Sequence, residues 1–177
     1  MTIGLITGSV ASNGLNKKLS KAVSEILHDL DEEVVFLPIN KLPFYSADYD
    51  NDFPDFGKEL KDGIESVEKI IIVSPEYNHS ISAPLKNAID WASRPWGSNS
   101  WAGKKVLLLT ATISSNKGIF NFEATRNVLE YLEAEIVDEL GLLITPNIFA
   151  SNYSGVTVIK DTTINNEVRN SVKNFIA

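Results

Sequence analysis

The sequence predicts an α/β protein built on a doubly wound sheet of five parallel strands in the order 2-1-3-4-5, with helices on both faces. Strand-like and helix-like patterns alternate along the 177 residues. The first, third and fourth strand segments are apolar on both faces, as expected for a parallel sheet that helices cover on each side. The length fits one domain, residues 1–177, and a hydrophobic content of 44% is enough for a sizeable core.

The N-terminal half contains three predicted strands. The run "IGLIT" is short and apolar and is closed by Gly8 and Ser9, so it predicts the first of them. The next segment has leucine, valine and isoleucine side chains at helical spacing along one side. A loop rich in aromatic and acidic residues precedes the second helix. In order, the predicted elements are strand Ile3–Thr7, helix Leu15–Leu30, strand Glu33–Pro38, loop Leu42–Asp55, helix Phe56–Val67 and strand Lys69–Ser74.

The C-terminal half continues the alternation, without a repeat, a linker or a low-complexity segment. The stretch "APLKNAIDWA" predicts a helix, because Pro84 fits the first helical turn, where its missing N–H costs nothing. We expect the fifth strand to be broken near Gly141. The predicted elements after that helix are strand Lys104–Thr112, helix Phe120–Ala134, strand Glu135–Ile144 and helix Asn165–Ile176.

Composition excludes several classes of function. Sixteen basic and 23 acidic residues give a net charge of −7, which argues against nucleic acid or an anionic membrane as the main partner. The absence of cysteine excludes disulfides, thiolate nucleophiles and cysteine-based metal sites, and with only His28 and His79 we expect no metal site. The N-terminus has no signal-peptide pattern, and Pro146 and Gly155 exclude a spanning helix in Leu140–Ile159. We therefore expect a cytoplasmic protein.

The predicted strand order places a ligand crevice at the carboxyl ends of strands one and three. The loop after strand one, "TGSVASNGLNKKL", offers side-chain donors from Ser9, Ser12 and Asn13, and Gly14 permits close approach of the backbone. These residues stand where a helix begins, with free amides and the positive end of its dipole, so they suit a terminal phosphate. Alternatively, Ser12 or Asn13 simply caps the helix. The loop matches neither the Walker pattern nor the dinucleotide-binding G-x-G-x-x-G pattern.

The loop after strand three, "SPEYNHS", raises a similar choice. Pro75 stiffens the backbone, successive amides from Glu76 to Ser80 are placed to face the polar edge of a ligand, and Tyr77 offers an aromatic face. In the alternative, Tyr77 packs on a neighbouring helix and Asn78 closes a turn. We expect His79 to be a solvated loop residue.

The helix Pro84–Trp91 is apolar on two sides and therefore needs two partners. One stripe suits the sheet, and the other includes Ala88 and Trp91. The second partner is either another subunit or the Arg94–Gly103 loop of the same chain. We expect a homodimer, or a dimer of dimers, formed through this helix.

Together the two loops resemble the NADPH-dependent FMN reductase family, flavodoxin-like enzymes that include quinone, chromate and azo-dye reductases. The family pattern near the start is roughly G-S-x-R-x-x-S-x-N-x-x-L, and here Gly8, Ser9, Asn16 and Leu19 are in register, whereas Ala11 and Gly14 replace the usual Arg and Ser. The second pattern, P-E-Y-N-x-S-x-P-G-x-L-K-N-A-I-D-W, matches closely. In it Ser82 and Ala83 replace the usual Pro-Gly. The resemblance covers the whole domain.

The resemblance implies bound FMN, with NADPH or NADH as electron donor and a small-molecule acceptor such as a quinone, an azo compound, a metal oxyanion or free flavin. It implies hydride transfer through the flavin, without a catalytic side chain of the protein. The residues implied for the FMN phosphate are Ser9, Ser12, Asn13, Gly14, Leu15 and Asn16. Those implied for the isoalloxazine edge are Pro75, Glu76, Tyr77, Asn78, His79 and Ser80. Those implied for a third contact, after strand four, are Thr112, Ser114 and Ser115.

Two other interpretations stay open. In the first, the protein is a non-enzymatic electron carrier like a flavodoxin, although "GSVASNG" lacks the Thr-x-Thr-Gly character of the flavodoxin phosphate loop. Alternatively, it is a relative of the fold that has lost flavin and serves as a binding module, which the departures at Ala11 and Gly14 would permit.

Overall fold

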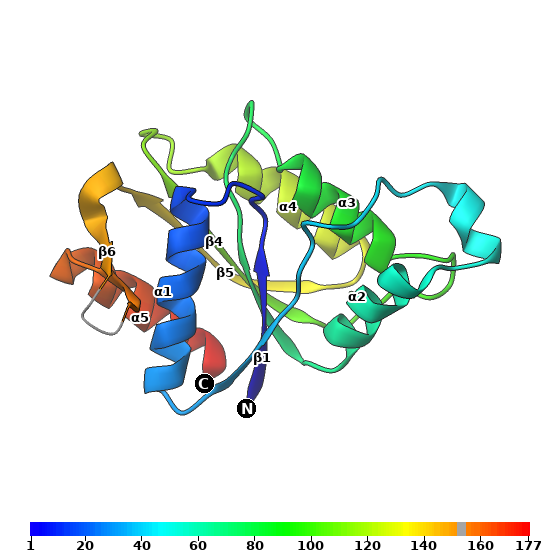
Figure 1. The fold of residues 1–177 in the computed structure, drawn as a ribbon, viewed down its shortest axis with the longest axis horizontal. Coiled ribbons are helices and arrows are strands. Elements are labelled where there is room, and N and C mark those ends of the chain that lie inside the picture. The colour runs from blue at the N-terminus through cyan, green and yellow to red at the C-terminus, as the bar shows by residue number, and fades with distance from the viewer. Residues whose placement is uncertain (152–154) are drawn as a thin grey trace.

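The predicted architecture is confirmed by a computed structural model that describes residues 1–151 and 155–177. Residues 152–154, inside the segment Leu140–Ile159 considered above, lie outside this description. The main sheet has five parallel strands in the order β2-β1-β3-β4-β5, with helices packed on both sides (Figure 1). The strands are β1 (Thr2–Thr7), β2 (Glu33–Phe36), β3 (Lys69–Val73), β4 (Lys105–Thr112) and β5 (Glu135–Leu143), and the helices are α1 (Leu15–Asp29), α2 (Asp55–Glu65), α3 (Ala83–Ala92), α4 (Ile119–Tyr131) and α5 (Thr162–Ile176).

Each face of the sheet carries its own apolar core. Side chains alternate between the faces of a strand, so Ile71 and Leu107 join one core while Ile70 and Leu108 join the other. Helices α1 and α5 cover the first face, and α2, α3 and α4 cover the second. Because both faces are buried, a slip of one residue would exchange the two cores, and the register of the strands is therefore fixed.

Two differences from the predicted elements, one in β5 and one at the start of α5, have clear local reasons. β5 runs unbroken through Gly141, so the predicted break there is wrong; the irregularity lies earlier, where the pairing with β4 skips Val137. Gly141 has another role, because a Cβ at this position would lie 2.1 Å from the carbonyl oxygen of Lys117. α5 begins at Thr162, before the predicted start, because the Asp161 carboxylate accepts hydrogen bonds from the first-turn amides.

The chain also contains short elements that the sequence pattern did not predict. They are the 3-10 helices η1 (Ala47–Asn51) and η2 (Pro146–Ile148) and the antiparallel pair β6 (Phe149–Ser151) and β7 (Thr157–Ile159).

The second apolar side of α3 is covered by the chain itself. Trp91 has 0% of its surface exposed, and its indole N–H donates to the carbonyl oxygen of Pro43 at 2.8 Å. Four aromatic rings surround it at centroid distances of 5.0–5.4 Å: Tyr45, Tyr49, Phe53 and Phe56. Neither expected partner of this helix side, another subunit or the Arg94–Gly103 loop, covers Trp91, although that loop contacts α3, since the Trp101 indole N–H donates to the Ile89 carbonyl at 3.2 Å. The loop Leu42–Asp55 and the start of α2 cover it.

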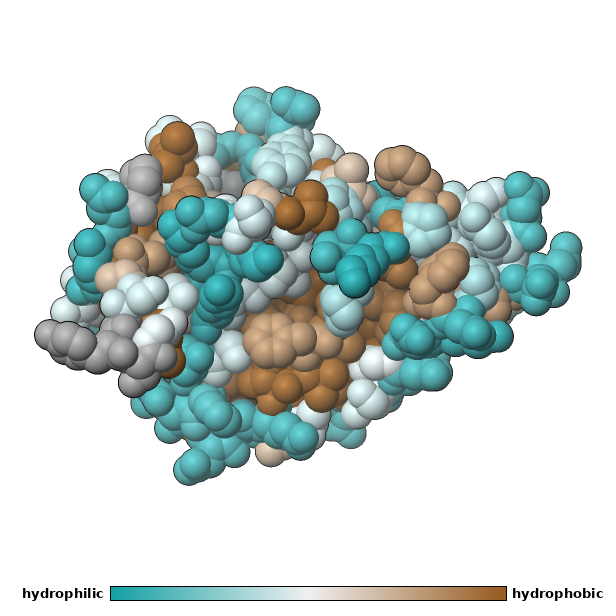
Figure 2. All heavy atoms as spheres, in the orientation of Figure 1, coloured by the Kyte–Doolittle hydropathy of each residue, from teal (hydrophilic) through white to brown (hydrophobic). Residues whose placement is uncertain are grey.

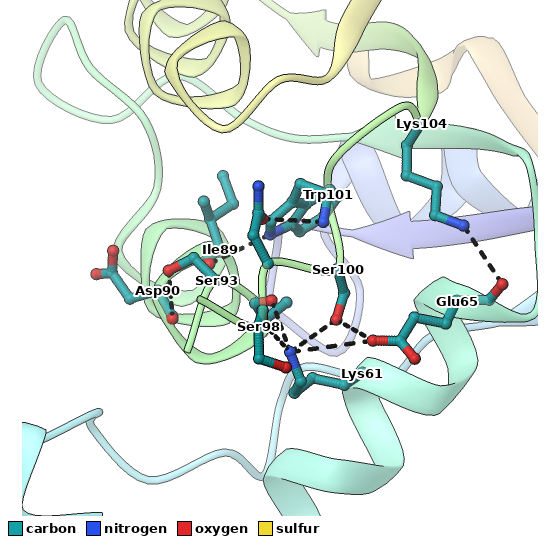
Figure 3. A network of polar contacts seen from close by, with 11 residues as sticks. Lys61, Glu65, Ile89, Asp90, Ser93, Ser98, Ser100, Trp101 and Lys104 are labelled. Atoms are coloured by element: carbon teal, nitrogen blue, oxygen red, sulfur yellow. Dashed lines mark hydrogen bonds and ion pairs between the residues drawn. The ribbon is translucent and has the colours of Figure 1, made fainter. Parts of the chain in front are cut away.

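A buried lysine fixes the chain that leaves α3. The Lys61 ammonium of α2 donates to the carbonyl oxygens of Ala92 and Ser98 and, at 2.8 Å, to the hydroxyl of Ser100, which in turn donates to Glu65 (Figure 3). Burial lowers the pKa of Lys61, and the nearby acidic side chains oppose that shift. The cost of burying the charge is offset by three acceptors, so α2 and α3 are held in one arrangement.

Replacing Trp91 tests this arrangement. We expect Trp91→Ala to lower the free energy of unfolding by about 3–5 kcal/mol, because it removes a fully buried indole and leaves a cavity. Denaturant unfolding measures this loss, and Phe44→Ala is the control, since the Phe44 side chain is 84% exposed. A stability change equal to the control's, together with a smaller particle size, would instead place Trp91 in a subunit interface.

Candidate functional site

Three loops meet at the carboxyl edge of the sheet, along the top of the molecule in Figure 1. They follow β1, β3 and β4, and the chain order reverses between β1 and β3, where ligands of such sheets bind. The sheet hydrogen bonds continue one residue beyond the strands: the Gly8 amide donates to Val73 at 2.8 Å, and the Ser74 amide donates to Leu109 at 3.0 Å. The loops therefore start side by side.

The first loop presents donors that the helix does not use. The N-cap residue of α1 is Gly14, and no side chain caps this helix. The alternative that Ser12 or Asn13 caps it is therefore wrong, and both residues are exposed. The amides of the first turn lack intrahelical partners by geometry, and they carry the positive end of the dipole. Ser9 is buried, with its hydroxyl accepting from the Ala11 amide at 3.3 Å.

Asn16 has a different position from its neighbours in the predicted phosphate set. Its side chain is buried and makes two hydrogen bonds with the backbone of Ala111, donating at 2.9 Å and accepting at 2.8 Å. Its amide group is thus occupied, and only its backbone N–H, in the first turn of α1, is placed to serve an anion. The same pair of bonds ties α1 to the end of β4.

The second loop forms a tight turn. The amides and carbonyls of Tyr77 and Ser80 bond to each other at 3.1 Å in both directions, and Asn78 and His79 between them have φ of +50° and +56°. Two positive φ values in a row are the mark of a type I′ turn. Asn78 therefore does close a turn, but Tyr77 is 50% exposed and is not buried against a helix. His79 is exposed, and its ring stacks on Phe120.

The other predicted site residues of the second and third loops differ in burial and in hydrogen bonding. Pro75 is buried, and the Glu76 carboxylate accepts hydrogen bonds from the start of α4. In the third loop the Thr112 hydroxyl accepts from the Ser114 amide at 3.0 Å, while Ser114 and Ser115 are exposed. The predicted set therefore lies on three loops of one edge. Its assignment to a ligand stays a prediction.

Sequence reasoning did not assign Ser82 to the site, although it noted Ser82 as a departure from the family pattern. Ser82 is fully buried, and its hydroxyl donates to the Gly8 carbonyl at 2.6 Å. The Ser82 hydroxyl oxygen lies 3.4 Å from the Ser74 hydroxyl oxygen. Gly8 packs closely against Ser74, because a Cβ on Gly8 would lie 2.5 Å from the Ser74 hydroxyl oxygen. Ser82 thus joins the first loop to the second.

Lys17 is the second residue that the pattern did not single out. It stands in the first turn of α1 and lines a cavity of about 190 Å³ together with Ser9 and Val10. Lys17 thus lies beside the loop in which Ala11 stands at the usual arginine position.

An apolar hollow adjoins the cavity beside Lys17 and shares the lining residues Phe36 and Pro38 with it. Figure 2 shows apolar side chains gathered near the centre of the molecule, between β2 and α2, where a cavity of about 430 Å³ is lined by residues that include Phe36, Leu42 and Leu60. None of the predicted site residues lines it.

Residues 1–151 and 155–177 contain neither a metal-binding cluster nor a helix able to span a membrane. No group of three or more histidine and acidic side chains there is arranged to hold a metal ion. No helix in this part of the chain combines the length and apolar character needed to cross a membrane.

Comparison with known proteins identifies the family. The model of the NADPH-dependent FMN reductase family matches residues 1–146, so the chain belongs to this family. A Burkholderia sp protein named 2-hydroxy-1,4-benzoquinone reductase is 33% identical over 162 residues, which cover 92% of this chain and 88% of that protein. FerB from Paracoccus denitrificans, a flavoenzyme NAD(P)H:(acceptor) oxidoreductase, superposes with a TM-score of 0.86 at 28% identity, over 99% of this chain and 94% of FerB.

A more distant structure shows the fold alone. An FMN-dependent NADH-azoreductase from Bacillus anthracis, solved in complex with FMN, superposes with a TM-score of 0.65 at 14% identity and full coverage of both chains. The family and the fold thus agree with the resemblance that the two loop patterns carry.

The link through Ser82 can be tested directly. We expect Ser82→Ala to lower the free energy of unfolding by about 1–3 kcal/mol, because the buried Gly8 carbonyl loses its partner. Ser66→Ala is the matched control, since the Ser66 hydroxyl also donates to a backbone carbonyl but at an exposed helix end. Denaturant unfolding compares the two, and equal losses would show that the link between the loops contributes nothing.

Proposed function

We propose that this protein is an FMN-dependent NAD(P)H oxidoreductase that uses a quinone as electron acceptor. The observation that carries the proposal is the uncapped start of α1, with exposed Ser12 and Asn13, beside the turn Tyr77–Ser80 at the switch point of the sheet. The family assignment supports the flavin and the reductase activity. The quinone is taken from the names of the relatives.

The residues present fit FMN in two respects. A phosphate suits the first loop, because hydroxyl, amide and first-turn N–H donors converge at the positive end of a helix dipole, and Lys17 adds a positive charge nearby. The edge of a flat ring suits the second loop, since the amides of Asn78 and His79 take no part in the bonds that close its turn. Exposed Val10 and Tyr77 offer apolar surface beside these donors.

In this proposal the protein supplies placement and polarity. FMN, held by the first and second loops, would supply the redox chemistry between the nicotinamide and the acceptor. The helix start holds the phosphate, the stiff turn fixes the edge of the ring, and Tyr77 narrows the site around the acceptor. We assign no catalytic proton transfer to any side chain.

The family assignment favours this enzyme over the electron carrier and over the binding module that has lost flavin. Among the acceptors, the quinone is supported by the relative from Burkholderia sp, whose name specifies a benzoquinone. NADPH is supported as donor by the description of the family. The cytoplasmic location expected from the sequence is part of the proposal.

We also propose a homodimer, although Trp91 no longer supports it. Two other aromatic side chains beside α3 and α4 are strongly exposed, Trp96 and Tyr131. They line a hollow of about 480 Å³ together with Lys86 and Arg94. Burial of these rings against a second copy would remove the exposed apolar surface.

The phosphate site is tested with Asn13→Asp. We expect this variant to weaken FMN binding by about tenfold or more, because it places a carboxylate beside the phosphate, and to leave riboflavin binding unchanged. Fluorescence titration measures both ligands, and Asn170→Asp, on the exposed side of α5, is the control for added charge. An equal effect on FMN and riboflavin would remove the phosphate from this loop.

The acceptor is tested by steady-state kinetics. With FMN-loaded protein and NADPH, we expect a higher kcat/KM for a benzoquinone than for an azo dye. The comparison uses one enzyme preparation and one donor concentration, so that only the acceptor differs. A preference for the azo dye would overturn the quinone assignment and leave the flavin assignment standing.

The homodimer is tested with Trp96→Glu. We expect this substitution to convert a dimer into a monomer, because it places a charge in the proposed apolar contact. Sedimentation equilibrium measures the mass, and Ser98→Glu in the same loop is the control. A monomeric wild-type protein would end the proposal.

A further inference from the structure

The carboxylate of Glu76 bonds to a part of the chain far away in sequence. One oxygen accepts from the side-chain amide of Asn116 at 2.7 Å, and the other accepts from the backbone amides of Phe120, at 3.0 Å, and Asn121, at 3.3 Å. Phe120 lies 44 residues along the chain from Glu76. Glu76 in the second loop is therefore bonded to the third loop and to the start of α4.

These contacts supply the N-terminal cap that α4 lacks. Its N-cap residue is Gly118, at φ +79°, and no side chain at that position accepts a hydrogen bond. The first amides of a helix need partners from elsewhere, and a carboxylate also balances the positive end of the dipole. Glu76 meets both needs, so a side chain from the second loop performs the capping that a local residue usually performs.

Two further contacts join the same pair of segments. The His79 ring stacks on the Phe120 ring with centroids 4.4 Å apart and an angle of 17° between the planes. The Asn121 side chain donates to the Ser74 carbonyl at 3.4 Å. One of these contacts lies before Glu76 in the second loop and the other after it, so the loop is attached to α4 at three points.

The turn Tyr77–Ser80 depends on such attachment. Asn78 and His79 both have positive φ, and for a residue with a Cβ that conformation costs about 1–2 kcal/mol. Without partners outside the turn, these four residues would leave the conformation more often. The start of α4, held through Glu76 and His79, provides those partners.

We propose that Glu76 is a positioning residue, which locks the turn Tyr77–Ser80 onto α4 and thereby sets the affinity of the site for flavin. The inference rests on the proposed function for the ligand, but the locking itself does not. The carboxylate is fully engaged by α4 and Asn116, so Glu76 acts on a flavin through the backbone that it holds. Loops two and three then move as one unit.

The test compares Glu76→Ala with Glu76→Gln. Alanine removes every acceptor, whereas glutamine keeps one oxygen that can accept from the Phe120 and Asn121 amides. Glu123→Gln, at an exposed glutamate further along α4, is the matched control. Two readouts are taken: hydrogen exchange of the Tyr77 and Ser80 amides in protein without flavin, and the FMN dissociation constant from fluorescence titration.

We expect Glu76→Ala to speed exchange of the Tyr77 and Ser80 amides and to weaken FMN binding, each by about tenfold. Glutamine restores most of both values, and the control changes neither. If Glu76→Ala does not fold, Glu76→Asp replaces it, because its shorter side chain cannot reach all three donors.

A different pattern of exchange would overturn the proposal. If exchange speeds up at the start of α4 while the turn amides and the FMN affinity stay at wild-type values, Glu76 is a helix cap without a role in the site. Because the exchange readout needs no flavin, wild-type protein that fails to bind FMN would count against the proposed function alone.

Discussion

The close packing of Gly8 against Ser74 is the constraint on which the site depends. A side chain at Gly8 would lie 2.5 Å from the Ser74 hydroxyl, and the Gly8 amide and carbonyl are both bonded, to Val73 and Ser82. Because there is no room for a Cβ, the chain after β1 stays directly beside the end of β3. The donors of the first loop are thereby placed beside the turn of the second loop, and a ligand can contact both.

The rest of this edge extends the same principle of loops joined by buried polar contacts. Asn16 bonds the start of α1 to the end of β4, the Thr110 hydroxyl donates to the Ser74 carbonyl, and Glu76 bonds to α4. Loops that leave buried strands carry polar backbone groups that need partners. Here the partners come mostly from neighbouring loops, so the edge is one connected network above two apolar cores.

The fold could be predicted from the sequence because strands that are buried on both faces consist of continuous apolar runs. The order of helices and strands along the chain then restricts the topology. Contacts between distant segments left no such local pattern. Trp91 lies on the second apolar side of α3, but no residue close to it in the sequence indicates that Tyr49 and Phe53 cover it. The sequence predicts a ligand contact for the backbone of Glu76. It does not show that the Glu76 side chain caps a helix 44 residues away, because that contact depends on the tertiary fold. Ser82 was visible only as a departure from a family pattern.

The central claim is that this edge holds a flavin that the nicotinamide can reduce. The visible absorption spectrum of the purified protein, titrated with FMN and then mixed with NADPH without oxygen, tests it most directly. We expect the flavin spectrum to shift when FMN binds and to bleach rapidly when NADPH is added. Binding without bleaching by NADPH or NADH would contradict the reductase. An unchanged FMN spectrum would contradict the site itself.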